Sequence, residues 1–383
     1  MKRKIKNRIN IIADVNIPFL KGVFEAFADI KYLNYQDITK NTIKDADALI
    51  IRTRTKCDEL LLEKTNVKLI TTATIGHDHI DKNYCKLKGI EWISAPGCNS
   101  NSVLQYVLSA LFYLVDKENY DLQDKTIGII GVGNVGIKVQ RAAENLGLKV
   151  LLNDPPRERK EGKTNFVSLD KITSECDIIT FHVPLNYSGI YKTFHLANEY
   201  FFKSLKKKPI LINTSRGEVI PTESLKFALE NKLISHLVLD VWENEPKIDL
   251  SLMNMCSIAT PHIAGYSVEG KANGTAVCVN AINDFFKLGL VKNWYPTNLP
   301  LLDNNEIFID GSNKFEQKII SNILLRAYNI IEDDKRLRIS PSKFEELRAN
   351  YQVRREYSYF NLVLTNSNST VINKIKQFKF NVK

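Results

Sequence analysis

The chain has 383 residues, of which 44% are hydrophobic and 25% charged, the balance of a globular protein with more than one domain. The formal charge of +10 could suit a nucleic-acid binder, but no RNA-binding motif or DNA-reading helix accompanies it. No run of about 18 apolar residues could span a membrane, and the six cysteines lack the spacing of a zinc site or a disulfide framework.

The first residues are basic, but only four apolar residues, 9–12, follow them before polar residues and a proline interrupt the run. We therefore expect no signal peptide at residues 2–12. Reduced thiols in a cytoplasmic protein are the simplest explanation of the cysteines. Neither nucleic acid nor a membrane is expected as a partner.

Short runs rich in β-branched residues alternate with stretches of helical spacing. The first predicted strands are 10–14, 48–52, 69–74 and 91–95. A long apolar-periodic helix is predicted over 102–114, and strands resume at 126–131, 149–154, 177–183, 209–215, 237–241 and 257–260. This alternation is typical of parallel strands joined by crossover helices and predicts two α/β units in tandem.

The character of the chain changes near residues 293–300, where asparagine and proline alternate. A helical segment over 315–332, a charged segment over 344–357 and a strand over 360–365 are predicted beyond this break. This tail is too long for a floppy terminus, and we interpret it as a third domain used for association.

The sequence of residues 126–136, TIGIIGVGNVG, is an apolar strand that runs into a GxGxxG turn and a helix. Gly131 would permit the tight turn, Gly133 would let the backbone approach a pyrophosphate, and Gly136 would allow close packing of helix on strand. Amide groups at the start of the helix would attract the phosphates. The turn therefore predicts dinucleotide binding, with Asn134 and Val135 among the cofactor contacts.

An acidic residue stands where recognition of a ribose needs one. Asp154 ends the next predicted strand, 18 residues beyond Gly136, and its carboxylate can bind ribose hydroxyls and repel a 2′-phosphate. This predicts NAD rather than NADP. Arg157 could tolerate a 2′-phosphate, but we expect Pro155 and Pro156 to form a turn that carries it elsewhere.

Three further motifs follow predicted strands: NTSRG at 213–217, LDVWENEP at 239–246 and TPHIAGY at 260–266. His262 could take the hydroxyl proton of an alcohol, Glu245 could orient its imidazole, and Arg216 could bind a carboxylate. Taken singly, they could be a helix-capping histidine, a loop carboxylate and a surface arginine. Together, at the carboxyl ends of parallel strands, they predict the oxidation of a secondary alcohol.

The first unit carries groups that suit an anion at its predicted strand ends. Arg52, Thr53 and Thr74 could surround a phosphate, and Tyr266 offers a phenol to the same cleft. We predict these four residues as substrate contacts, although threonines at strand ends can merely cap the following helix.

Other histidines are given no chemical role. His77, Asp78 and His79 could suggest a metal, but no third or fourth ligand is recognisable, so no metal site is expected. His182 and His195 are interpreted as structural or rim residues.

The motifs GVGNVG, NTSRG, DVWENEP and TPHIAG together resemble the D-isomer-specific 2-hydroxyacid dehydrogenase family. The resemblance implies that Arg216 binds substrate, that Glu245 pairs with the histidine, and that His262 is the acid/base. Further cofactor contacts implied in this way are Val183, Thr214, Ser215, Arg216, Gly265 and Asp240, the last near the nicotinamide carboxamide.

Within this family the chain is more similar to the erythronate-4-phosphate dehydrogenase branch. The similarity rests on ADVN at 13–16, IRTRTK at 51–56, TATIGHDH at 72–79, APGCN at 95–99, HIAGYSVEGK at 262–271 and, in the tail, RLR at 336–338 and FEELRANYQVRRE at 344–356. Thr53 stands where serine is expected, Val183 where threonine is expected, and Ser215 where cysteine or alanine is usual. Thr53 keeps the hydroxyl, whereas Val183 has none.

The resemblance implies an α/β fold of two Rossmann-like parallel-sheet domains with a cleft between them, plus a small C-terminal α+β dimerisation domain. Residues 1–98, completed by about 268–290, would bind substrate, 99–267 would bind NAD, and 291–383 would form a homodimer. The implied reaction is the NAD-dependent oxidation of 4-phospho-D-erythronate, a small phosphorylated hydroxy acid, at C2. The alternatives are a 3-phosphoglycerate or other D-2-hydroxyacid dehydrogenase and an NAD-sensing protein without turnover.

Overall fold

The computed structural model describes residues 8–312 and 314–383, so most of the basic run at residues 2–8 lies outside the described residues. The chain divides into two compact units. The first combines Met1–Asn99 with Val268–Pro300, and the second combines Ser100–Ser267 with Leu301–Lys383. The chain therefore crosses between the units three times, after Asn99, after Ser267 and after Pro300.

The first unit is built on a parallel sheet of five strands in the order β2-β1-β3-β4-β5. Its strands are β1 (Asn10–Asp14), β2 (Asp29–Leu33), β3 (Ala48–Ile51), β4 (Leu69–Thr72) and β5 (Glu91–Ile93). Every residue of β3 and β4 is buried, as expected for parallel strands covered on both faces. The shorter helices of this unit are η1 (Tyr35–Asp37), α1 (Glu59–Leu62) and α2 (Lys82–Lys88).

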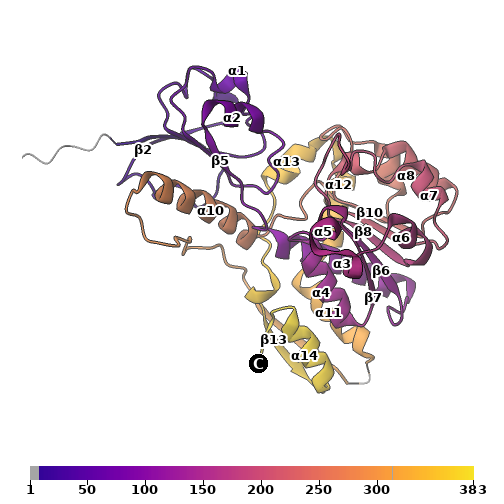
Figure 1. Cartoon of the computed structure of the whole chain (residues 1–383). Coiled ribbons are helices and arrows are strands. Elements are labelled where there is room, and N and C mark those ends of the chain that lie inside the picture. Colours follow the sequence, from indigo (N-terminus) through magenta and orange to yellow (C-terminus); the bar gives the residue numbers. More distant parts are fainter. Residues whose placement is uncertain (1–7, 313) are drawn as a thin grey trace, which may run out of the picture. The chain divides into compact units, whose positions relative to one another are not determined.

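One long helix of the first unit comes from the second crossing. Helix α10 (Val268–Phe286) packs on this sheet through Cys278, Val279 and Ile282 (Figure 1). A Cβ at Gly274 would lie 2.6 Å from the carbonyl oxygen of Ala73, so only glycine lets α10 come this close to the end of β4.

The second unit contains a parallel sheet of six strands in the order β11-β10-β9-β8-β6-β7. They are β6 (Thr126–Ile130), β7 (Lys149–Asn153), β8 (Ile178–Phe181), β9 (Ile210–Asn213), β10 (His236–Leu239) and β11 (Ile258–Ala259). Strand order reverses at β6, which pairs with β7 on one side and β8 on the other. Open α/β sheets bind ligands at such a reversal, outside the carboxyl ends of the strands.

Helices flank this sheet (Figure 1). They are α3 (Ser100–Glu118), α4 (Gly136–Leu146), α5 (Pro155–Glu161), α6 (Leu169–Glu175), α7 (Glu199–Lys203), α8 (Thr222–Glu230) and α9 (Leu250–Met255), with the 3-10 turns η2 (Lys163–Asn165) and η3 (Gly217–Val219). Among them α3 is apolar over most of its length, and 13 of its 19 residues are buried.

The tail forms a small parallel sheet in the order β12-β13-β14. Its elements are β12 (Glu306–Asp310), α11 (Glu316–Ala327), α12 (Ile330–Ile339), η4 (Pro341–Lys343), α13 (Phe344–Ala349), η5 (Tyr357–Tyr359), β13 (Asn361–Thr365), α14 (Ser369–Gln377) and β14 (Asn381–Val382). Helix α11 shares a hydrophobic core with α3. Ser321 donates a hydrogen bond to Asp116 (2.6 Å), and Ser109 donates one to the Tyr328 carbonyl (2.7 Å). The tail is therefore part of the second compact unit.

The fold class predicted from the sequence is confirmed: two parallel α/β sheets and a small C-terminal sheet. One predicted helix is wrong. Residues 315–332 form two helices instead, because Tyr328 is extended (φ −151°, ψ 112°) and Asn329 begins a new helix by accepting a hydrogen bond from the Ile331 amide. The three-domain division and the cleft stay predictions.

The described part of the chain contains no helix long and apolar enough to cross a membrane. All six cysteines are free thiols, and five of them are buried.

Candidate active site

The turn after β6 fits the phosphates of a dinucleotide. Gly131 has φ +90°, and a Cβ there would lie 2.6 Å from the His182 carbonyl oxygen. A Cβ at Gly136 would overlap the Gly131 carbonyl oxygen, so neither glycine can be replaced without movement of the backbone. A Cβ at Gly133 would meet no described atom within 4 Å beyond its chain neighbours. This leaves room for a ligand over the exposed residues Gly133 and Asn134. Val135 is half-buried beside them, at the start of α4.

Asp154 holds this turn from the next strand. One carboxylate oxygen accepts the Val132 amide (2.8 Å), and the other accepts the Arg157 amide (3.1 Å) and so caps α5. Because a carboxylate offers about four acceptor sites, Asp154 can still accept ribose hydroxyls. The residues present therefore fit NAD.

The expectation for Arg157 is wrong. Pro155 and Pro156 begin helix α5 rather than a turn that leads away, because proline suits the first turn of a helix. The helix returns Arg157 to the glycine-rich turn, where its guanidinium donates to the Val132 carbonyl (2.6 Å) and pairs with Glu161 (2.7 Å).

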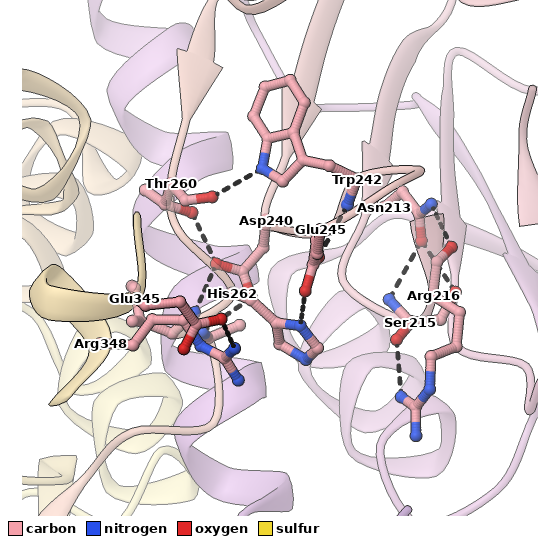
Figure 2. A network of polar contacts seen from close by, with 12 residues as sticks. Asn213, Ser215, Arg216, Asp240, Trp242, Glu245, Thr260, His262, Glu345 and Arg348 are labelled. Atoms are coloured by element: carbon pink, nitrogen blue, oxygen red, sulfur yellow. Dashed lines mark hydrogen bonds and ion pairs between the residues drawn. The ribbon is translucent and has the colours of Figure 1, made fainter. Parts of the chain in front are cut away.

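His262 and Glu245 form a close pair. Nδ1 of His262 lies 2.7 Å from Oε2 of Glu245, while Oε1 of Glu245 accepts the Trp242 amide (2.9 Å). His262 adopts φ 57°, a left-handed conformation that is uncommon outside glycine, asparagine and aspartate. The bond at Nδ1 leaves Nε2 as the ring nitrogen that can meet a substrate (Figure 2).

Glu245 is held in its charged form. Burial alone would raise the pKa of this carboxyl, but the charge and hydrogen bond of His262, the Trp242 amide and the charge of Arg348 together hold the pKa below its ordinary value. An ionised Glu245 accepts the Nδ1 hydrogen of His262 and so fixes the tautomer of the imidazole.

Asp240 has a part in this site that the sequence did not indicate. Its side chain is 1% exposed, and its oxygens accept the Thr260 hydroxyl (2.6 Å) and the amides of Ile263 and Ala264 (both 2.8 Å). The carboxylate therefore fixes the loop that carries His262. Both of its oxygens are engaged within the protein, so contact with a nicotinamide stays a prediction.

Arg216 lies at the same sheet edge. It follows β9, which pairs in parallel with β10, and β10 pairs in parallel with β11. Strands β10 and β11 lead to Glu245 and His262. Its guanidinium donates to the Ser215 carbonyl (2.8 Å), and Figure 2 shows it on the same side of the strand ends as the imidazole. A Cβ at Gly217 would overlap the Trp242 backbone, so glycine lets the loops after β9 and β10 touch.

The remaining predicted cofactor contacts line the same strand ends. The Thr214 hydroxyl lies 3.3 Å from Nδ1 of His182, and the Ser215 hydroxyl donates to Asn213 (2.8 Å). Val183 is half-buried against the apolar core and offers no polar side-chain group, and Gly265 is half-buried after the His262 loop.

A tail residue also reaches this region. The guanidinium of Arg348, on α13, lies 5.9 Å from the centre of the Tyr266 ring, and Nη1 lies 3.3 Å from Glu345 (Figure 2). Tyr266 also packs edge-on against Tyr351, with ring centres 5.8 Å apart. In the sequence Arg348 stands out only within a tail motif, and no local pattern indicates its approach to the His262 loop.

The predicted anion-binding residues lie at the strand ends of the first unit. Arg52 follows β3 and forms an ion pair with Asp14 (2.9 Å), a wholly buried carboxylate at the end of β1. The Thr74 hydroxyl donates to the Gly76 carbonyl (3.0 Å), and Thr53 is exposed. In the sequence Asp14 stands out only within the ADVN motif, and the signal for its pairing with Arg52 is an acidic residue that ends a neighbouring strand.

Two further histidines have structural contacts. His182 lies between the hydroxyls of Thr180 (3.0 Å) and Thr214, and burial lowers its pKa to about 3. His77 stacks on Trp92, with ring centres 5.1 Å apart. Within residues 8–312 and 314–383, no group of three or more histidine, cysteine, aspartate or glutamate residues could hold a metal ion.

Comparisons with known proteins identify the family. Residues 113–264 match the family described as D-isomer specific 2-hydroxyacid dehydrogenase, NAD binding domain, and residues 299–377 match one described only as a domain of unknown function. The erythronate-4-phosphate dehydrogenase of Bacteroides thetaiotaomicron is 51% identical over 93% of this chain and 99% of its own length. The chain belongs to the erythronate-4-phosphate dehydrogenase family.

Less similar relatives carry the same name. The proteins of the same name from Porphyromonas gingivalis and Escherichia coli O127:H6 are 43% and 39% identical, over 93% and 91% of this chain and 95% and 93% of their own lengths. The chain is thus an NAD-dependent oxidoreductase, and the predicted cofactor and enzyme class are confirmed.

Solved structures of related dehydrogenases share the fold. NAD⁺-bound 3-phosphoglycerate dehydrogenase of Entamoeba histolytica has a TM-score of 0.62 and 27% identity over 74% of this chain and 97% of its own. D-Lactate dehydrogenase of Aquifex aeolicus, complexed with NAD and lactic acid, has a TM-score of 0.58 and 28% identity over 73% of this chain and 95% of its own.

Proposed function

We propose that this enzyme oxidises 4-phospho-D-erythronate at C2 to 2-oxo-3-hydroxy-4-phosphobutanoate, a step of pyridoxal 5′-phosphate (vitamin B6) biosynthesis. The observation that carries the proposal is the His262–Glu245 pair (2.7 Å) at the sheet edge that also bears Arg216. The names of relatives that match more than nine-tenths of the chain support the choice of substrate.

His262 acts as the base. Its Nδ1 hydrogen is held by the ionised Glu245, so the lone pair of Nε2 accepts the proton of the C2 hydroxyl. The O–H bond breaks, the C2–O bond becomes a carbonyl, and the hydrogen on C2 departs with its electron pair. Bound at the turn of Gly131–Gly136 and at Asp154, NAD would supply the acceptor for that hydride.

Arg216 binds the C1 carboxylate and polarises the C2 oxygen, because a guanidinium offers two parallel donors. Arg52, oriented by Asp14, binds the phosphate together with Thr53 and Thr74, and the Tyr266 phenol contributes a further donor. Gly131, Gly133, Asn134, Val135 and Gly136 hold the pyrophosphate, and Asp154 holds the adenosine ribose.

The protein acts as a homodimer through residues 291–383, and it acts in the cytoplasm. Exposed apolar side chains in the tail support association: Phe308 on the edge strand β12 is 56% exposed, and Phe315 is 88% exposed. Light scattering on the purified chain should give twice the monomer mass, and Phe308→Lys should reduce that mass.

A 3-phosphoglycerate dehydrogenase is the alternative, since a protein of that name shares the fold. Turnover should be measured as NADH absorbance with 4-phosphoerythronate, 3-phosphoglycerate and D-lactate, each in both reaction directions. We expect the highest kcat/KM for 4-phosphoerythronate. Equal or higher values for either of the other acids would refute the choice of substrate.

A further inference from the structure

A cavity of about 570 Å³ lies in the second unit, and none of its lining residues belongs to the predicted active site. It is bounded by the start of α3, by one face of α4, and by the chain near η5 and after α14. Its volume is within the range of small-molecule sites in proteins.

Three cations face this cavity. Lys138 and Arg141 are three residues apart on α4, so they lie on the same face of the helix, and Lys379 comes from the chain after α14. Burial, followed by the charges of Lys379 and Arg141, lowers the pKa of Lys138 against the opposing charge of Glu356. The charges of Arg141 and Lys379 therefore both act on Lys138.

Two carboxylates also line the cavity, but other groups hold them. Glu356 is 5% exposed and accepts the hydroxyls of Ser102 (3.1 Å) and Ser267 (2.9 Å) and the amide of Asn101 (3.0 Å). Glu144 accepts the side-chain amide of Gln140 (2.9 Å).

The three cations have fewer hydrogen-bond and ion-pair partners than the carboxylates do. Lys138 donates to the Asn101 side chain. Among the described residues, the guanidinium of Arg141 and the ammonium of Lys379 have neither a hydrogen bond nor an ion pair. An excess of positive charge is thus left facing the cavity.

The rest of the lining is mixed, with the polar residues Asn145, Ser358 and Gln377 beside apolar ones. Leu104, Ala142 and Phe378 supply an apolar wall. Tyr357 is 5% exposed, and its hydroxyl is buried without a hydrogen-bond partner in the part of the chain that the structure describes.

We propose that this cavity binds a small organic phosphate monoester, with its phosphate among Lys138, Arg141 and Lys379 and its organic part against Phe378 and Tyr357. A dianion suits three neighbouring cations better than a monoanion does, and charge-assisted hydrogen bonds from lysine and arginine are the usual means of holding a phosphate.

The test uses the full chain saturated with NAD and phenyl phosphate as the probe, measured by calorimetry. Because the predicted substrate site could bind the same probe, all proteins carry Arg52→Gln. We expect saturable binding that weakens at least tenfold when Arg141→Gln and Lys379→Gln are added. Lys376→Gln is the matched control, because Lys376 is an exposed lysine of α14 outside the cavity lining, and it should leave the affinity unchanged.

Two further ligands test the class of compound. Benzoate should bind at least tenfold more weakly than phenyl phosphate, and benzyl alcohol should not bind measurably. Equal affinity for benzyl alcohol, the absence of saturable binding in the Arg52→Gln protein, or unchanged affinity in the Arg141→Gln/Lys379→Gln protein would each overturn the proposal. Arg141 and Lys379 are both exposed, so these variants should retain the thermal unfolding midpoint of the Arg52→Gln protein.

A measurement without variants locates the site directly. Crystals of the NAD-loaded protein soaked in tungstate, a heavy analogue of phosphate, should show anomalous density within hydrogen-bonding reach of Lys138 and Arg141. Tungstate density confined to other places would overturn the proposal.

Discussion

Two histidine–glutamate pairs of the second unit have nearly the same geometry and different surroundings. Nδ1 of His262 lies 2.7 Å from Glu245, and Nε2 of His195 lies 3.0 Å from Glu243. Both histidines have φ 57°, and their side chains are 32% and 37% exposed. The distance and exposure of each pair therefore do not distinguish the predicted catalytic pair from the other pair.

The neighbours of each pair do distinguish them. The His195 ring stacks on Phe194 with ring centres 3.8 Å apart, and Glu243 also accepts the amide of Thr222 at the start of α8 (2.5 Å). Glu245 instead receives the Trp242 amide and the charge of Arg348, while Asp240 fixes the loop that carries His262. The supporting contacts, and not the geometry of the pair itself, therefore separate the predicted acid–base pair from the other pair.

The largest difference in kcat/KM between the two pairs should come from replacing their histidines. His262→Asn should lower kcat/KM by about 10²- to 10⁴-fold, because a general base is lost. Asparagine tolerates a positive φ, so the loop should keep its conformation and NAD should bind with wild-type affinity. His195→Asn is the matched control and should leave kcat/KM near wild type. Equal losses in the two variants would end the distinction between the pairs.

Replacing the two carboxylates should produce a smaller difference in kcat. Glu245→Gln should lower kcat by about 10- to 100-fold, because a neutral amide neither fixes the imidazole tautomer nor stabilises its charged form. Glu243→Gln should leave kcat unchanged and cost about 1 kcal/mol of the free energy of unfolding, because it weakens the hydrogen bond to Thr222. Steady-state kinetics and urea unfolding of both variants provide the comparison, and a larger kinetic loss in Glu243→Gln would reverse it.

His182 has no carboxylate partner among its hydrogen bonds and extends the comparison to pH. Burial lowers its pKa to about 3, so the unfolded chain takes up a proton near pH 6.5 that the folded chain refuses until about pH 3. This contribution to stability is fully present above pH 6.5 and is lost as the pH falls toward 3. Between pH 6.5 and 5 the loss lowers the free energy of unfolding by about 2 kcal/mol.

His182→Gln should remove this contribution and so flatten the decline in the free energy of unfolding between pH 6.5 and 5. Urea titrations at several pH values measure the slope. If the variant lost stability as steeply as the wild type, the proton uptake would have to be assigned to another group.

The smallest expected effect belongs to Arg348. Its side chain is 15% exposed and its charge helps to keep Glu245 ionised, so Arg348→Met should lower kcat/KM about fivefold, equivalent to about 1 kcal/mol. Arg348→Lys should recover part of the loss, because it keeps the charge. Lys343→Met removes a nearby exposed cation and should have no effect. Wild-type kinetics in Arg348→Met would show that the tail does not assist the pair.

The sequence predicted those features of the fold that depend on local pattern. Strands β3, β4 and β9 are buried throughout and rich in aliphatic and β-branched residues. The glycine spacing after β6 reports a positive φ at Gly131 and a close backbone approach at Gly136. Strands β2, β12 and β14 were not predicted, because they are short or partly exposed and lack a continuous apolar run.

The sequence could not predict which distant groups support the site. Arg348 and Tyr266 meet only because α13 packs beside the His262 loop, and Asp14 orients Arg52 only because β1 and β3 are neighbours in the sheet. The prediction for Arg157 was wrong for a local reason, because a pair of prolines can begin a helix as well as a turn.

Strand β11 lies at the edge of its sheet, and the tail covers that edge. The Ala259 amide donates to Asp334 (2.7 Å), Arg338 donates to the carbonyls of Met253 (3.0 Å) and Cys256 (2.9 Å), and Arg354 donates to the Ala264 carbonyl (2.5 Å). These contacts hold both ends of the segment that presents His262.

During translation, the His262 segment therefore leaves the ribosome well before the residues that brace it. A nascent chain that stops before α12 would carry an open strand edge, the kind of surface that recruits other strands. Competence for hydride transfer should arise late in synthesis, once residues up to about 354 have emerged and folded back.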